Sequence, residues 1–139
     1  MPGGRARRYA ETGAGYDRKD DVMGRTVMVV DDHSSVGDML GQMLGILGHE
    51  AEVFSSPSAC LEWLETGSPD IALLDIRMPG IDGVSLLAEI REMGHTFPVV
   101  AITGYPGDKL VREVREMGAI AVAAKPVSME LLSGLVQLA

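Results

Sequence analysis

The chain has 139 residues, of which 46% are hydrophobic and 23% charged, and its formal net charge is −8 at pH 7. This composition favours one globular domain and excludes a disordered chain, a collagen-like chain and a disulfide scaffold. No stretch reaches the ~18–20 consecutive apolar residues of a membrane-spanning helix, and no apolar run follows the N-terminal arginines as in a secretory signal. The acidic charge argues against nucleic-acid binding.

The cysteine content and the N-terminal composition set two further expectations. Cys60 is the one cysteine in the sequence, so no intrachain disulfide is possible and a cytoplasmic location is predicted. The scattered histidines have no zinc-ligand spacing. Residues 1–24 are rich in Gly, Arg and Asp and have no apolar period. We interpret them as a disordered tail or linker before a domain over residues 25–139.

From Thr26 onwards, short apolar runs alternate with longer runs of helical spacing. The apolar runs are typical of strands buried on both faces, at residues 27–30, 51–54, 71–74, 98–102 and 119–124. The helical runs follow them at residues 36–47, 57–64, 84–93, 108–117 and from 128 to the end of the chain. Ser34 and Ser35 are candidate N-caps of the first helix, Ser128 is one of the last, and residues 76–83 are expected to form a loop.

Five strands that alternate with five helices predict an α/β fold of the (βα)₅ type. We expect a doubly wound, flavodoxin-like, parallel five-stranded sheet of order 2-1-3-4-5 with helices on both faces. Such sheets bind ligands outside the carboxyl ends of their strands. The residues that follow each strand are therefore the candidates for chemistry.

Charged and hydroxyl side chains stand at four of these strand ends. They are Asp31 and Asp32, then Asp75, Thr103 and Lys125. Three carboxylates in one crevice repel one another, and a cation with all-oxygen ligands offsets that repulsion, which favours a hard ion such as Mg²⁺. A carboxylate can also attack phosphorus to form an aspartyl phosphate, and the remaining groups can neutralise the transferred charge.

The segments DD, DIRMPGIDG, TGY and KP stand in this order, each at a strand end. Together they resemble the receiver domain of two-component response regulators, of the kind seen in chemotaxis regulators, over about residues 25–139. The resemblance implies that Asp75 is the phosphoacceptor and that Thr103 and Lys125 hold the phosphoryl group, with Thr103 also moving as the switch. It implies a phosphohistidine donor on a sensor histidine kinase or a histidine phosphotransfer protein.

The same resemblance implies a magnesium site and a signalling role. Asp32, Asp75 and the backbone carbonyl of Arg77 would bind Mg²⁺, and Asp31 would act mostly through metal-bound water. The module would switch the binding of a downstream protein whose identity the sequence does not give, with no nucleic-acid or membrane partner. We expect either a free-standing single-domain regulator or the C-terminal receiver of a hybrid kinase.

One position departs from the family pattern. Most receivers carry Tyr or Phe three residues before the lysine, where this chain has Val122. We therefore expect Tyr105, or the loop of residues 104–107, to carry the readout. Thr-Gly-Tyr at this place resembles an atypical receiver class and the receivers of hybrid kinases. In the family, the positions of Arg77 and Tyr105 affect how fast water removes the phosphoryl group.

Alternative interpretations remain for the chain and for His33. A small Mg²⁺-dependent phosphohydrolase with an aspartyl-phosphate intermediate would use similar chemistry, but Arg77 stands where such enzymes carry a second acid. A degenerate receiver that only docks would lack a site residue, and none is missing. His33 is interpreted as a solvent-facing loop residue, with a role as a base near the acidic pair as the alternative.

Overall fold

The computed structural model describes residues 6–12 and 22–139, which build one sheet in the order β1-β3-β2-β4-β5-β6. The strands are β1 (Arg7–Tyr9), β2 (Thr26–Val30), β3 (Glu50–Phe54), β4 (Ile71–Asp75), β5 (Val99–Thr103) and β6 (Ala121–Ala124). All neighbours pair in parallel except β1, which is antiparallel to β3. If β1 is left out and the strands β2 to β6 are counted from one to five, the order is the predicted 2-1-3-4-5. The predicted fold is therefore confirmed.

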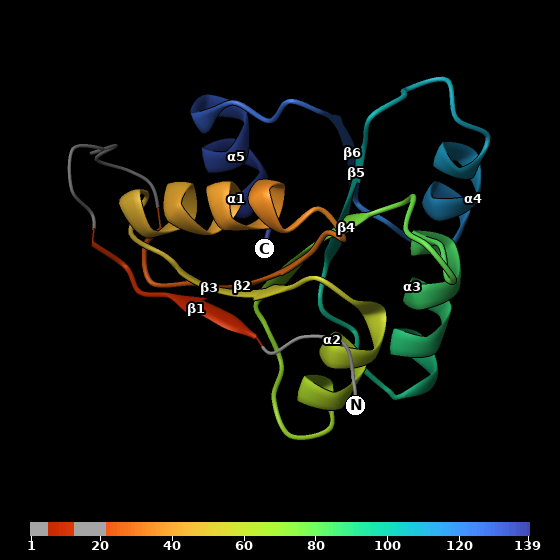
Figure 1. Ribbon diagram of the computed structural model, residues 1–139, viewed down its shortest axis with the longest axis horizontal. Coiled ribbons are helices and arrows are strands. Elements are labelled where there is room, and N and C mark those ends of the chain that lie inside the picture. The colour runs from red at the N-terminus through yellow and green to blue at the C-terminus, as the bar shows by residue number, and fades with distance from the viewer. Residues whose placement is uncertain (1–5, 13–21) are drawn as a thin grey trace.

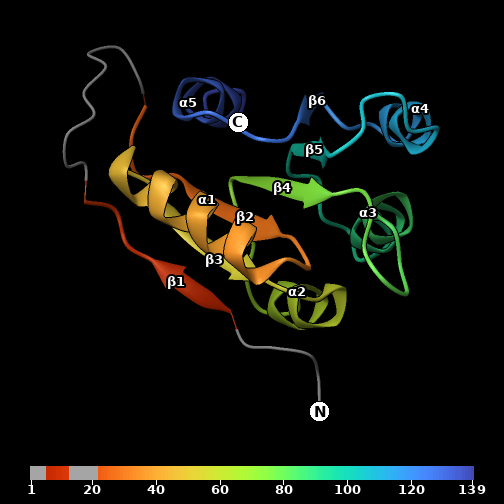
Figure 2. The ribbon, with the colours of Figure 1, turned by 45° about the horizontal axis from the view of Figure 1, so that its top comes forward.

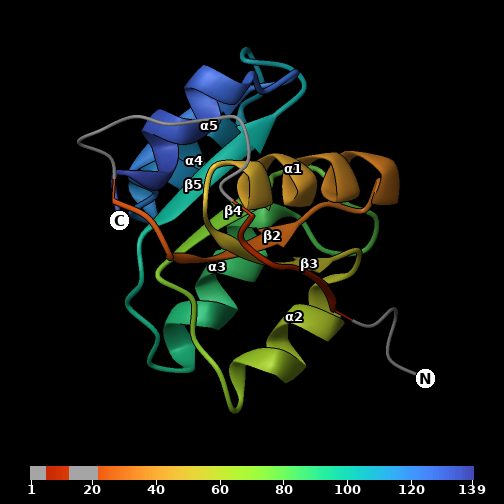
Figure 3. The ribbon, with the colours of Figure 1, turned by 90° about the vertical axis from the view of Figure 1, so that its left-hand side faces the viewer.

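Within the described ranges, five helices cover the two faces of this sheet (Figure 1, Figure 3). They are α1 (Ser34–Ile46), α2 (Pro57–Leu64), α3 (Gly83–Glu92), α4 (Leu110–Glu116) and α5 (Met129–Val136). Helices α1 and α5 pack on one face, and α2, α3 and α4 pack on the other. Among the described residues, every helix is too short or too polar to span a lipid bilayer.

The core consists of two apolar layers separated by the sheet. Alternate residues of β2 point to opposite faces, so Met28 joins the layer under α2, α3 and α4, while Val29 joins the layer under α1 and α5. Cys60 lies fully buried in the first layer, and burial raises the pKa of its thiol to about 12. Cys60 is therefore a packing residue of this core layer.

The helix starts differ in part from the predicted ones. Ser128 caps α5, since its side chain accepts a hydrogen bond from the Leu131 N–H over 3.1 Å. The prediction for α1 is wrong, because His33 is its N-cap residue and both serines lie inside the helix. Gly83 was expected in a loop but begins α3, because the Asp82 side chain caps that helix.

The N-terminal segment contains an element that the sequence does not predict. Arg7–Tyr9 pair with β3 and close the outer edge of the sheet (Figure 2). The Arg7 guanidinium and the Tyr9 hydroxyl both donate to Asp38 in α1. Residues 7–9 are therefore structured, in contrast to the expected tail. Residues 1–5 and 13–21 lie outside the described residues, so the predicted boundary at residue 25 remains a prediction.

A row of glycines on α1 allows this segment to approach the helix backbone. Gly37, Gly41 and Gly45 lie four residues apart and therefore share one face of α1. A Cβ atom at Gly41 would lie 2.4 Å from the Tyr9 ring, and one at Gly45 would lie 2.8 Å from the Ala10 carbonyl oxygen. The segment that contains β1 thus packs where any larger side chain on α1 would collide with it.

Candidate functional site

The predicted site residues gather at the carboxyl edge of the sheet. Asp31 directly follows β2, Asp75 ends β4, Thr103 ends β5 and Lys125 directly follows β6. The parallel register aligns these ends, because Asp75 pairs with Ile102 and the neighbouring Thr103 pairs with the last residue of β6. The strands therefore deliver all four polar side chains to one rim, as the (βα)₅ pattern predicts.

Lys125 joins two of the carboxylates. Its Nζ lies 2.9 Å from Asp31 Oδ2 and 3.2 Å from Asp75 Oδ2. Asp31 is 2% exposed and Asp75 is 4% exposed, so one ammonium group serves two buried carboxylates. The Lys125–Pro126 peptide bond that follows is cis.

The electrostatics of the rim show a surplus of negative charge. Burial raises the pKa of Asp75, and the neighbouring Asp31 adds to this, while the Arg77 backbone N–H and Lys125 lower it only in part. Burial lowers the pKa of Lys125, but its ion pairs with Asp31 and Asp75 outweigh this effect, so its pKa is raised. The ammonium group therefore stays charged. Its single positive charge does not balance the neighbouring carboxylates, so a further cation would stabilise their ionised forms.

The donor atoms at the rim fit a divalent cation. One ligand atom from each of Asp31, Asp32, His33 and Asp75 can be chosen so that all lie within 4.8 Å of one another. Asp32 Oδ1 is buried and accepts no hydrogen bond within the described part of the chain. The His33 Nδ1 lies 3.4 Å from this oxygen, a contact that is an ion pair only when the imidazole is protonated. A buried carboxylate oxygen that accepts no hydrogen bond is a group that Mg²⁺ would satisfy, since Mg²⁺ prefers oxygen ligands.

His33 lies beside this acidic group and faces solvent. Its side chain is 66% exposed, and its Nδ1 lies 3.5 Å from Asp31 Oδ1 and 3.4 Å from Asp32 Oδ1. The exposure agrees with the interpretation as a loop histidine. The two contacts nevertheless place the imidazole against the acidic pair.

The loop after β4 contains an ion pair that the sequence does not reveal. The Arg77 N–H donates to Asp75 Oδ1 over 3.1 Å. The Arg77 guanidinium points elsewhere, donating from Nε and one terminal nitrogen to the two Asp108 oxygens over 2.6 and 2.7 Å. These residues are 31 positions apart in two loops, and no periodicity in the sequence links them.

The Thr103 hydroxyl is engaged by its own loop. Thr103 is 1% exposed, and its Oγ1 donates to the Tyr105 carbonyl oxygen over 2.9 Å and accepts from the Tyr105 N–H over 3.0 Å. Tyr105 itself is 68% exposed. Val122, at the departure from the family pattern, packs partly buried against the core. Thr103 therefore lies at the rim with its hydroxyl bound to the β5–α4 loop.

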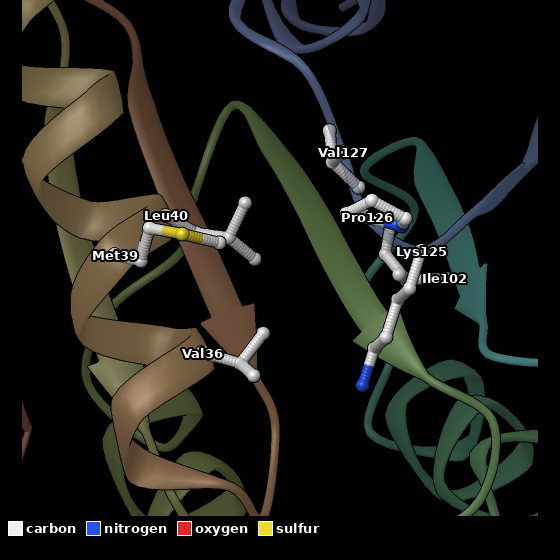
Figure 4. A pocket seen from close by; sticks show the side chains of 7 residues that line it. All are labelled: Val36, Met39, Leu40, Ile102, Lys125, Pro126 and Val127. Atoms are coloured by element: carbon white, nitrogen blue, oxygen red, sulfur yellow. The ribbon is translucent and has the colours of Figure 1, made fainter.

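An apolar hollow of about 310 Å³ adjoins the rim. Val36, Met39 and Leu40 of α1 form one wall, and Ile102, Pro126 and Val127 face them (Figure 4). Figure 4 shows the Lys125 side chain extending past the hollow toward the end of β4. The ammonium group is thus directed at the carboxylates, and the hollow itself is lined by hydrocarbon.

Comparisons with known proteins identify the family. The family described as response regulator receiver domain matches residues 27–137. The chain is 34% identical over 116 residues to the sensor histidine kinase RcsC of Salmonella typhimurium, covering 84% of this chain and 12% of the kinase. It is 34% identical over 111 residues to the DNA-binding transcriptional regulator NtrC of Escherichia coli, covering 80% of this chain and 24% of that protein.

Solved structures agree with this result. A CheY-like response regulator receiver domain from Methanospirillum hungatei has a TM-score of 0.77 and 25% identity, covering 83% of this chain and 92% of that one. The chain belongs to the response regulator receiver domain family of two-component signal transduction. No comparison supports the phosphohydrolase alternative. The chain spans 12% and 24% of the two curated relatives, so it corresponds to one part of each.

Proposed function

We propose that Asp75 is the phosphoacceptor of this receiver domain. The observation that supports it best is its buried carboxylate, 3.2 Å from the Lys125 ammonium and beside Asp31. An Asp75 oxygen attacks the phosphorus of a phosphohistidine, a P–O bond forms and the P–N bond breaks. The imidazole nitrogen keeps the electron pair. Lys125 neutralises charge on the transferred group, and the Thr103 hydroxyl donates to it after leaving the Tyr105 carbonyl.

We propose that Asp31, Asp32, Asp75 and the backbone carbonyl of Arg77 hold Mg²⁺, with Asp31 acting mostly through water. The unsatisfied Asp32 Oδ1 and the surplus negative charge support this assignment. When bound, Mg²⁺ supplies positive charge to the carboxylates and to the phosphoryl oxygens. The protein contributes a preformed and largely buried set of oxygen ligands.

We propose a signalling role without turnover of a small substrate. The phosphodonor is a sensor histidine kinase or a histidine phosphotransfer protein, and the phosphorylated chain binds a downstream protein. The relatives named above are a sensor histidine kinase and a transcriptional regulator, so receiver domains of this kind occur in both contexts. A cytoplasmic location remains part of this proposal.

Tyr105 is the proposed readout residue. The residue is 68% exposed, while its backbone binds the Thr103 hydroxyl through both the carbonyl and the N–H. Movement of Thr103 toward a phosphoryl group therefore displaces Tyr105. Tyr105→Ala should abolish phosphorylation-dependent capture of the downstream protein and leave phosphoryl uptake unchanged; unchanged capture would refute this role.

The test of the phosphoacceptor is intact-mass spectrometry after incubation with acetyl phosphate and Mg²⁺. We expect one phosphoryl adduct per chain in the wild type and none in Asp75→Asn. Asp82→Asn is the matched control, because it removes a carboxylate from the same β4–α3 loop while Asn still caps α3. An adduct that persists in Asp75→Asn, or steady release of phosphate over many turnovers, would contradict the proposal.

A further inference from the structure

A bidentate ion pair connects the two loops that flank the proposed phosphoacceptor. Arg77 lies in the loop between β4 and α3, and Asp108 lies in the loop between β5 and α4. The guanidinium donates to both Asp108 oxygens, over 2.6 and 2.7 Å. Charge-assisted pairs of this geometry are stronger and more directional than single contacts.

Asp108 is the fixed partner in this pair. Its side chain is only 7% exposed, whereas that of Arg77 is 60% exposed. Asp108 Oδ1 also accepts from the Leu110 N–H over 3.0 Å, and its own N–H donates to the Tyr105 carbonyl over 3.0 Å. The hydrogen bonds from Arg77 and Leu110 lower the pKa of Asp108, so it remains ionised. The long Arg77 side chain is thus the part that can move.

The pair determines where the positive charge of Arg77 is available. The Arg77 backbone binds Asp75, yet its guanidinium is committed to Asp108. We propose that Asp108 is a positioning residue that withholds the Arg77 guanidinium from the phosphoacceptor until a phosphoryl group competes for it. This inference rests on the proposed role of Asp75. It assigns the ion pair to the control of phosphoryl uptake.

The chemistry of both partners supports such a competition. A planar guanidinium binds phosphate and carboxylate in the same bidentate manner. An incoming phosphodonor is an anion that approaches a rim already rich in carboxylates, so an extra positive charge assists its approach and stabilises the transferred group.

The experiment measures the rate of phosphoryl uptake from acetyl phosphate with Mg²⁺ by intact mass. Asp108→Asn keeps the shape and the oxygen that caps Leu110 but removes the charge. We expect uptake about threefold to tenfold faster than in the wild type, since the guanidinium is released. Asp108→Ser, which also offers a cap oxygen, serves as a second variant, and Asp108→Glu should keep a rate near that of the wild type.

A double-variant cycle separates positioning from general loosening. In an Arg77→Gln background, which retains the backbone N–H and carbonyl, Asp108→Asn should change the rate by less than about twofold. Arg112→Gln breaks the exposed pair with Glu116 on α4 and should change nothing.

Two results overturn the positioning role: an unchanged rate in Asp108→Asn and Asp108→Ser, or the same acceleration with and without Arg77. If the wild type forms the adduct, Asp75→Asn does not, and the Asp108 variants give either of these results, then the proposed function stands and only this inference is refuted. A wild type that takes up no phosphoryl group refutes both.

Discussion

Carboxylates are paired differently in two regions of the sheet. One is the carboxyl rim, where Asp31, Asp75 and Lys125 meet, and the other is the outer edge formed by β1. At the rim, Asp31 and Asp75 are buried and share one ammonium group, and burial raises the pKa of Asp75. At the edge, Asp38 receives hydrogen bonds from both Arg7 and Tyr9, and its pKa is lowered. The rim therefore retains a surplus of negative charge, whereas the paired Asp38 carboxylate holds β1 against α1.

The largest expected effect tests the packing at the edge. Gly41→Ala should lower the free energy of unfolding by about 1–3 kcal/mol, because the new Cβ would lie 2.4 Å from the Tyr9 ring and β1 must move. Chemical denaturation measures this loss. In a Tyr9→Ala background the same substitution should become neutral or stabilising.

Gly134→Ala in α5 is the matched control for that substitution. Its Cβ would meet no atom within 4 Å. The usual helix preference for Ala over Gly then stabilises the protein by about 0.5–1 kcal/mol. Equal effects at the two glycines would show that β1 does not pack on α1 as described.

The next effect tests the surplus charge at the rim. In the absence of Mg²⁺, Asp75→Asn should stabilise the protein at pH 7 by about 1 kcal/mol, because the ionised carboxylate is disfavoured in the fold. The raised pKa means that the folded state binds the proton more tightly than the unfolded state. The destabilisation of the fold by the ionised Asp75 carboxylate therefore decreases as the pH falls through the pKa of Asp75 in the folded state.

Thermal melting of the wild type and Asp75→Asn between pH 4 and pH 8 measures this difference. The two curves should converge at the acidic end. A variant that melts below the wild type at pH 7 would show that Asp75 gains more from Lys125 than it loses by burial.

The smallest effect concerns the ion pair at the edge. Asp38→Asn should speed hydrogen exchange of residues 6–12 by about twofold to fivefold while leaving the melting temperature nearly unchanged, since partly exposed pairs contribute little. The lowered pKa of Asp38 means that its contribution is present above its ordinary value of 3.8 and is lost as the pH falls through the folded value. If residues 6–12 exchange their amide hydrogens at the same rate in the wild type and in Asp38→Asn at pH 7, Asp38 does not hold β1 in place.

The two regions also differ in how far the sequence predicts them. The rim follows from the position of each polar residue directly after an apolar run, because parallel strands bring their carboxyl ends together. Asp31, Asp75, Thr103 and Lys125 are placed correctly at one edge by that rule. Their chemical roles rest on the family resemblance and remain proposals.

The edge could not be predicted in the same way. A strand of three residues, two of them arginine, has no hydrophobic alternation, and its pairing with β3 depends on tertiary contacts. The spacing of Gly37, Gly41 and Gly45 was an available signal, since small residues on one helix face allow another segment to approach closely. The Arg77–Asp108 pair gave no signal, because it joins two loops through their tertiary positions.

The most direct test of the central claim locates the phosphoryl group in the chain. Borohydride reduces an aspartyl phosphate to homoserine, so the protein is treated with acetyl phosphate and Mg²⁺, reduced, digested and sequenced by mass spectrometry. The account predicts homoserine at position 75 and Asp at positions 31 and 32. Homoserine at either of the latter positions, or a phosphate on a hydroxyl or histidine side chain that survives reduction, would contradict it.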